Sequence, residues 1–553
     1  PHENNEKVSP MYLLHQRLAR IPVVGCTAWM LATAPGFVAA QVPGLPDEQR
    51  PNLAPVQSPI SQPAQSGAVR QGRVPGEQRQ AGLWFEPRVT VRHTVTNNAK
   101  LDATQQSDQL TELMPGFRLV SDTARIKGYA DYTLRYAHYA RNSAPDKIWH
   151  NLFARGTVEA VEKHAFVDLG GIVTLQPISA FGPTGGYSPA SSNMTQTSTF
   201  RVSPYLRGNF RDGLDYEARY ALTDTRYDTG ARSNVSVQDW LLHLGRRPIG
   251  QMWSWGVDAT QQNADYSNGR NIDTTAVRGR LSYSPMPQLR LAVIGGFEST
   301  NQLSLTKKSH DITGFGVDWR PSDRSRVSLE RESRYFGESH NARFEYRTAQ
   351  TVWRYTDKRG IVTGLGAQLG SMGPLSDLLD GFYSRTEPNP IRRAQLVQSE
   401  IARLGLPADM QVFPDFLTSS STLRRVQQLS FALLGQRSTL TLLVMRSDSR
   451  LLDNSLLSGD DFSTNSRIRQ HGWNLMLGHR LTPNASLSAS FGETRSVGSI
   501  PGLETRTRPF IVGWNTLVAR RTNVGIQLRR VLSDGNVSRY SESAIMGLVT
   551  HRF

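Results

Sequence analysis

The stretch "FRVSPYLRGNFR" (residues 200–211) alternates apolar and polar side chains at nearly every position. Phe200, Val202, Leu206 and Phe210 fall on one side of an extended chain, and the arginine, serine, tyrosine and asparagine residues between them fall on the other. A period of two residues is typical of a β-strand with one apolar face. The stretch therefore predicts such a strand.

The same alternation recurs along the chain. The next segment places Tyr216 opposite Glu217 and Arg219, and "AIMGLVTHRF" (544–553) alternates up to its last residue. Polar faces repeat in strand after strand, and no helical layer follows to cover them. A water-exposed sheet packed on a core is one interpretation. A transmembrane barrel fits better, because only alternate residues of its strands face lipid and the hydrophobic content, here 38 %, stays low.

Short polar turns separate the strands and give an estimate of their number. Outer-membrane barrels alternate short turns on one side with longer loops on the other. Ten short turns, with both ends of the barrel on the same side, predict an all-β, antiparallel outer-membrane barrel of about 22 strands, in a range of about 18 to 24, over residues 84–553. The turns are expected near positions 121, 162, 211, 246, 284, 320, 356, 435, 481 and 519.

The segment before the barrel predicts secretion. Residues 1–40 comprise upstream residues and, from Met11, a basic and then apolar stretch that ends in "VAA" before Gln41, which is typical of a signal peptide. The alternative is a lipoprotein cleavage box at Cys26, the one cysteine. With cleavage after Ala40 no disulfide or thiol chemistry is expected. Residues 41–83 are rich in Pro, Gln and Gly and predict a disordered periplasmic linker.

One long connection, residues 370–420, contains a helical pattern. Asn389 is a suitable N-cap, Pro390 suits the first helical position, and Gly405 suits the C-terminal cap, so the sequence predicts a helix over 390–404. We expect this insertion to belong to a loop that either constricts the lumen or lies above it. A purely structural role is the alternative.

The chain resembles the outer-membrane β-barrel family associated with PEP-CTERM/exosortase and exopolysaccharide gene clusters. The resemblance rests on "WFEPRVTVRHTVTNN" (84–98), "LMPGFRL" (113–119), "DYTLRYAHYAR" (131–141), "FRVSPYLRGNF" (200–210) and "HRLTPNASLSASFGETRS" (479–496). Together these stretches run along most of the barrel. The resemblance implies a role in secreting or assembling a surface polysaccharide rather than a particular reaction.

The net charge of +16 favours anionic partners. In a barrel, alternate-residue parity directs one set of arginines inward, where they suit carboxylate or phosphate groups of a polysaccharide or of small anions. Pairing with neighbouring lumen carboxylates is the alternative for each. The candidate anion contacts are Arg201, Arg207, Arg219, Arg290, Arg334, Arg343, Arg347 and Arg529.

Three functions therefore stay open: a conduit or assembly factor for exopolysaccharide, an anion-preferring general porin, and a structural or adhesive protein. We expect no enzyme, catalytic residue, cofactor or metal site, since the sequence has no HExxH motif, phosphate-binding glycine loop or Cys–His pair. Expected partners are outer-membrane lipid, export components, and the barrel assembly machinery, which would recognise the terminal aromatic Phe553; nucleic acid is not expected.

Overall fold

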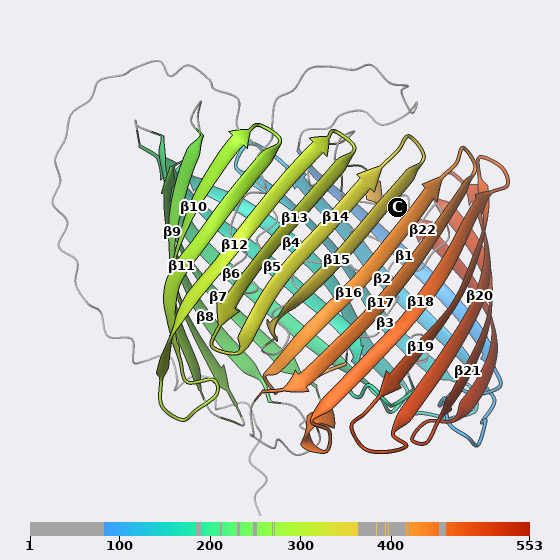
Figure 1. Ribbon diagram of the computed structural model, residues 1–553. Coiled ribbons are helices and arrows are strands. Elements are labelled where there is room, and N and C mark those ends of the chain that lie inside the picture. The colour runs from blue at the N-terminus through green and yellow to red at the C-terminus, as the bar shows by residue number, and fades with distance from the viewer. Residues whose placement is uncertain are drawn as a thin grey trace, which may run out of the picture. The chain divides into compact units, whose positions relative to one another are not determined.

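The fold is a closed antiparallel barrel of 22 strands, seen in Figure 1. The computed structural model describes residues 82–183, 190–210, 213–228, 233–246, 252–267, 269, 271–362, 383, 387, 393, 396–397, 416–418, 420–452 and 460–553. The strands are β1 (Leu83–Thr96), β2 (Asp108–Asp122), β3 (Ile126–Tyr139), β4 (Lys147–Val161), β5 (Ala165–Pro177), β6 (Met194–Asn209), β7 (Leu214–Tyr227), β8 (Val235–Arg246), β9 (Trp253–Tyr266), β10 (Ile272–Met286), β11 (Leu289–Thr300), β12 (Lys308–Ser322), β13 (Ser325–Arg334), β14 (Gly337–Arg347), β15 (Thr351–Val362), β16 (Thr422–Leu434), β17 (Ser438–Leu451), β18 (Arg467–Arg480), β19 (Ala485–Val497), β20 (Glu504–Ala519), β21 (Thr522–Gly535) and β22 (Tyr540–Arg552), with a single turn of 3-10 helix, η1 (Asp461–Ser463), between β17 and β18.

Each strand pairs with the strands before and after it in the sequence, and β1 pairs with β22 to close the ring. The closing register runs from Arg88 opposite Arg552 to Thr96 opposite Ala544. The hydroxyls of Thr90 and Thr550 lie 2.8 Å apart across this seam. Closure leaves no strand edge unpaired, which is the condition for a sheet to cross a membrane. The predicted fold class and strand number are confirmed.

The two rims of the barrel differ in their connections. At the turn end, uppermost in Figure 1, ten short turns follow the even-numbered strands, and both β1 and β22 have their outer termini there. The loop end carries the connections that follow the odd-numbered strands, including the long one between β15 and β16.

Nine of the ten short connections between strands lie where the sequence predicts turns, although residues 211–212 and 247–251 of two of them lie outside the described residues; the turn predicted near 356 is wrong. Residues 356–360 lie inside β15, and the turn is 348–350. The polar residues of this stretch are paired across strands instead: Asp357 accepts hydrogen bonds from Arg425 Nε at 3.0 Å and Nη2 at 2.6 Å.

The two faces of the wall differ as the alternation predicts. On β6, Phe200, Val202 and Leu206 face outward with about half of their surface exposed, whereas Ser203 and Tyr205 face the lumen and are buried. Aromatic pairs also lie on the outer face, among them Tyr220 with Trp240 and Trp253 with Tyr283, each with ring centroids 4.7 Å apart. An apolar outer face with aromatic residues is typical of membrane barrels.

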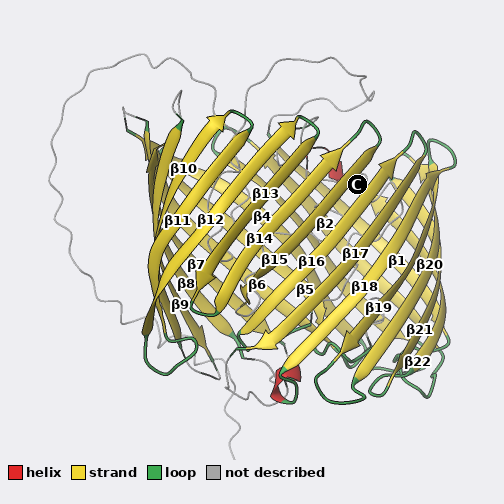
Figure 2. Ribbon diagram, in the orientation of Figure 1, coloured by secondary structure: helices red, strands yellow, loops and turns green. Residues whose placement is uncertain are grey.

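Figure 2 shows that little helix accompanies the strands among the residues that the structure describes. Of the predicted helix over 390–404, the structure describes Arg393, Leu396 and Val397, all three in helical conformation; the rest of it, and most of 370–420, lie outside the described residues. Residues 1–81, with the predicted signal peptide and nearly all of the linker, also lie outside them. Within the described part of the chain, no helix is long and apolar enough to cross a membrane.

Candidate functional site in the lumen

Ion pairs cover much of the lumen wall, because many charged side chains alternate with outward-facing apolar ones along the strands and so face inward. On β1 to β3, Asp131 pairs with Arg88 and, at 3.1 Å, with Arg118. Glu112, which is 1 % exposed, pairs with Arg135 and lies 3.5 Å from Arg92. Such pairs neutralise charges whose burial would otherwise be costly.

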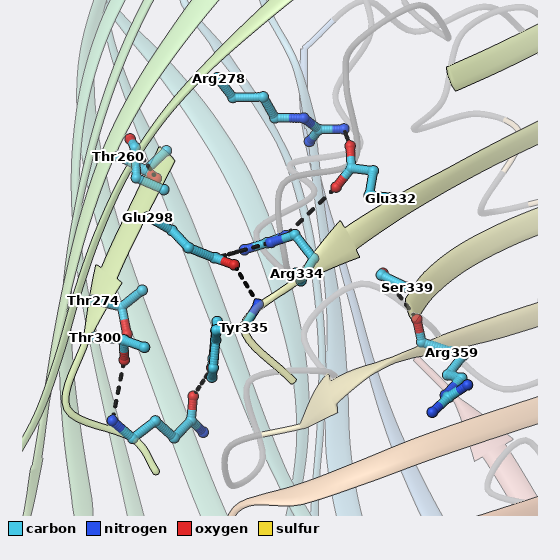
Figure 3. Close-up of polar contacts among 12 residues, drawn as sticks. Thr260, Thr274, Arg278, Glu298, Thr300, Glu332, Arg334, Tyr335, Ser339 and Arg359 are labelled. Atoms are coloured by element: carbon cyan, nitrogen blue, oxygen red, sulfur yellow. Dashed lines mark hydrogen bonds and ion pairs between the residues drawn. The ribbon is translucent and has the colours of Figure 1, made fainter. Parts of the chain in front are cut away.

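A larger network joins β10, β11 and β13 (Figure 3). The guanidinium of Arg278, almost fully buried, lies 2.6 Å from Glu330 and also contacts Glu332. Arg334 pairs with Glu298 at 2.5 Å and lies 3.6 Å from Glu332. The second oxygen of Glu298 accepts a 2.8 Å hydrogen bond from the backbone N–H of residue 335, so both of its oxygens have partners.

All eight arginines singled out in the sequence share the lumen-facing parity of their strands. Five of them pair with lumen carboxylates. The pairs are Arg219 with Asp168 at 2.8 Å and Glu217 at 2.9 Å, Arg334 with Glu298, Arg343 with Glu345 at 3.0 Å, Arg347 with Glu345, and Arg529 with Glu542 at 2.5 Å.

The other three arginines, Arg201, Arg207 and Arg290, form no ion pair with the residues that the structure describes. Arg201 Nη2 and Arg290 Nε are buried without a hydrogen-bond partner there. An unpaired guanidinium in a lumen wall keeps its full capacity for a carboxylate or phosphate. These three residues are therefore the strongest candidates for anion contacts among the eight.

Arg201 and Arg207 belong to a part of the wall on β5, β6 and β7 that we call the arginine–aromatic wall: Arg201, Arg207, Arg219, Phe166 and Tyr205. The Phe166 and Tyr205 rings stack with centroids 5.2 Å apart. The Cζ atom of Arg207 lies 4.3 Å from the Phe166 centroid, and that of Arg219 lies 3.7 Å from the Tyr205 centroid. Stacking fixes a guanidinium while its edge N–H groups stay available for anions.

At the loop end, three chain segments meet in what we call the loop bridge: residues 177–181, 416–418 and 460–462. The N–H of Ala180 donates to Asp461 Oδ2 at 2.7 Å, and the N–H of Leu417 donates to the carbonyl of Pro177 at 3.0 Å. Ala180, Phe181, Phe462 and Ile468 form one buried apolar cluster. The hydroxyl of Thr505 donates to the carbonyl of Phe181 at 3.0 Å.

The loop bridge spans part of the barrel opening rather than joining neighbours. Residues 177–181 comprise the last residue of β5 and the four that follow it, while Thr505 lies on β20. Along the shorter arc of the ring, the strands between β5 and β20 are β4, β3, β2, β1, β22 and β21. Leu417, 1 % exposed, likewise packs on Tyr227 of β7 although its own segment leads into β16. Thr505 and Tyr227 both face the lumen, so the bridge crosses it.

Sequence reasoning missed the loop bridge and the aromatic residues Phe166 and Tyr205, which stack on the lumen arginines. The parity that identified the eight arginines would also have selected Arg278 and Arg280, which alternate with Val277 and Leu281 in "VRGRLSYS" (277–284). No periodic signal marks the bridge. Among the described residues, no group of three or more His, Cys, Asp or Glu side chains is placed to hold a metal ion.

No protein-family model and no curated protein matches the chain. Among solved structures it is similar to the siderophore receptor PirA of Pseudomonas aeruginosa, at 11 % identity over 86 % of this chain and 81 % of that one, with a TM-score of 0.43. It is also similar to the FrpB iron transporter of Neisseria meningitidis (9 %, 85 % and 82 %, TM-score 0.47) and to OccAB3 of Acinetobacter baumannii (10 %, 85 % and 99 %, TM-score 0.32). At these values the likeness carries no inference about what this chain binds.

Proposed function

We propose that this chain is a non-enzymatic outer-membrane conduit or assembly factor for an anionic exopolysaccharide, as in the gene clusters of the family that it resembles. Its outer face would contact outer-membrane lipid, its turn end would face the periplasm, and Phe553 would serve the assembly machinery. The exposed apolar residues and aromatic pairs of the outer face support the membrane placement.

The arginine–aromatic wall is the observation that carries the proposal. An acidic polysaccharide offers carboxylate groups and the apolar faces of sugar rings. Arginine binds carboxylate groups through paired N–H groups, and aromatic rings pack against the apolar faces of sugar rings. Arg201 and Arg207 are not engaged by a described carboxylate, so an anionic sugar would not have to displace one. The loop bridge and the 370–420 insertion are the proposed control of access.

The test uses the full chain reconstituted in planar lipid bilayers, with polygalacturonate as the probe polymer. We expect the polymer to block the current and the wild-type pore to prefer anions. The double variant R201S/R207S should shift selectivity toward cations and weaken the block. The matched control is R226S, because Arg226 lies on the outer face of β7 and pairs with Asp224 at 2.8 Å.

In the native host, loss of the gene should lower surface polysaccharide while glycosyl transfer inside the cell continues. Unchanged selectivity in R201S/R207S, together with normal polysaccharide in the null strain, would overturn the conduit proposal. An anion-selective pore that the polymer does not block would instead favour the general porin. An absence of ion current would favour the structural or adhesive protein.

A further inference from the structure

Basic side chains form a row on the outer face of the barrel, in the loop-end half of β17 to β20. In the strand register Arg446 lies opposite His471, His471 opposite Arg495, and Arg495 opposite Arg506. These four residues are defined here as the basic row. Charged side chains on the lipid-facing side of a barrel wall are costly near the middle of a bilayer and less so near its surface, so the row marks the depth of the lipid headgroups.

The carboxylates around the row neutralise it only in part. Arg495 pairs with Glu504, and Asp448, which lies opposite Arg469 in the register, pairs with Arg467. Glu493 accepts hydrogen bonds from Arg506 at 2.7 Å and from Arg508 at 2.9 Å, so one carboxylate serves two guanidinium groups. Arg446 and its diagonal neighbour Arg469 are exposed, and neither side chain forms an ion pair or hydrogen bond with the described residues. The surface therefore retains an excess of positive charge.

An aromatic ladder lies directly on the turn-end side of the basic row. Trp473, Phe491 and Phe510 share the outward parity of the row on β18, β19 and β20. The ring centroids of Trp473 and Phe491 are 5.2 Å apart, and those of Phe491 and Phe510 are 6.5 Å apart. Phe491 and Phe510 each expose nearly half of their surface. The surface thus changes from charged to apolar within one outward step on β17 and β18 and within two on β19 and β20.

Another sector of the loop-end wall lacks this arrangement. On β8, β9 and β10 the outward residues Gln238, Asn263 and Asp273 lie opposite one another in the register. They present two amides and a carboxylate where β17 to β20 present three arginines and a histidine. The basic row is therefore a feature of one side of the barrel and not a general property of its rim.

We infer that the basic row and the aromatic ladder together bind a phosphorylated anionic glycolipid in the membrane leaflet at the loop end. Guanidinium groups bind phosphate oxygens through paired hydrogen bonds, and the ladder packs against the acyl chains directly below the headgroup. The contiguity of the row with the apolar outer face favours a lipid over a soluble anion. This inference rests on the membrane placement in the proposed function, but not on what the lumen transports.

The test measures binding of bis-phosphorylated lipid A to the purified, detergent-solubilised full chain by native mass spectrometry. An arginine near an anionic membrane surface contributes about fivefold in binding. The double variant R446S/R469S should thus bind lipid A about 25-fold more weakly, since two such contributions multiply. R226S, which removes an outer-face arginine elsewhere, should bind like wild type. Heat-modifiable migration on gels confirms that each variant is folded.

Dephosphorylated lipid A distinguishes recognition of the phosphate groups from simple contact with acyl chains. It should bind to the wild-type chain as weakly as intact lipid A binds to R446S/R469S. Equal retention of both lipids, or wild-type retention by R446S/R469S, would overturn the inference. The lumen variant R201S/R207S separates the two proposals: it should retain lipid A fully even though its ion selectivity changes. If its selectivity does not change, the conduit fails while the lipid site stands.

Discussion

The hydroxyl of Thr505 donates a 3.0 Å hydrogen bond to the carbonyl of Phe181, a residue 324 positions earlier in the chain. Both residues are buried, at 5 % and 3 % exposure. The bond ties the connection between β5 and β6 to the lumen-facing side of β20, so this connection cannot swing away from the opening without breaking it.

Replacing Thr505 by valine should loosen the loop bridge. Valine keeps the shape of threonine but cannot donate, and a buried carbonyl left without its donor costs about 1–3 kcal/mol. We expect T505V to show a higher or more frequently fluctuating single-channel conductance in planar bilayers. T507V is the control, because the Thr507 hydroxyl hydrogen-bonds at 3.3 Å to that of Ser533 on the neighbouring strand and not to a backbone carbonyl of the bridge. Identical traces for wild type and T505V would show that this bond does not restrict the opening.

Glu298→Gln should destabilise the barrel, because it leaves the Arg334 guanidinium without its closest counter-charge. Breaking a buried ion pair on one side costs about 3–5 kcal/mol, and the lower end applies since Glu332 still lies near Arg334. The free energy of unfolding, from reversible urea titration in lipid vesicles, measures the loss. In the control E338Q, which removes an exposed partner of Arg331, no measurable change is expected. Equal stability of E298Q and wild type would mean that the pair contributes no net stability.

The adjacent glycines 295 and 296 on β11 should respond oppositely to alanine. A Cβ atom on Gly296 would lie 2.1 Å from the carbonyl oxygen of Val277 on β10, so the backbone would have to shift, at about 1–3 kcal/mol. A Cβ atom on Gly295 meets nothing within 4 Å, and alanine there stabilises by about 0.4–1 kcal/mol through the unfolded state. The same urea titration tests both variants. A G296A barrel as stable as G295A would contradict the close approach of the two strands.

Asp146, in the connection between β3 and β4, should titrate below the ordinary aspartate range. The His138 ring and the Tyr136 hydroxyl each lie 2.8 Å from its Oδ2, and these hydrogen bonds lower the pKa of Asp146. A lowered folded-state pKa means that the stabilisation is present above the ordinary value of 3.8 and is lost as the pH falls through the folded-state value. Carboxyl chemical shifts followed against pH give the pKa directly. Tyr136→Phe should raise it toward 3.8; an unchanged pKa would mean that this hydroxyl does not contribute.

The alternation in the sequence was sufficient to predict the barrel, because strand parity is a local property that each segment reveals by itself. It placed Arg201 and Arg529 correctly toward the lumen for the same reason. Ion pairs two residues apart, such as Arg343 with Glu345, could be foreseen from parity as well. The pair Arg334–Glu298 could not, since it depends on which strands are neighbours and in what register. The turn expected near 356 was wrong because a polar, glycine-containing stretch is equally compatible with a strand whose charges pair across the sheet.

The β1–β22 seam has a consequence for how freely the chain could be cut and rejoined. Every strand pairs through its backbone only with the strands before and after it, and the β1–β22 seam is antiparallel like every hairpin. Residues 83 and 553 both lie at the turn end, where the N–H of Phe553 donates to the carbonyl of Pro87 at 3.0 Å. A circular permutant that links these two ends through a short turn and opens between β20 and β21 should therefore form the same ring. The geometry of the barrel thus does not dictate with which hairpin the chain begins.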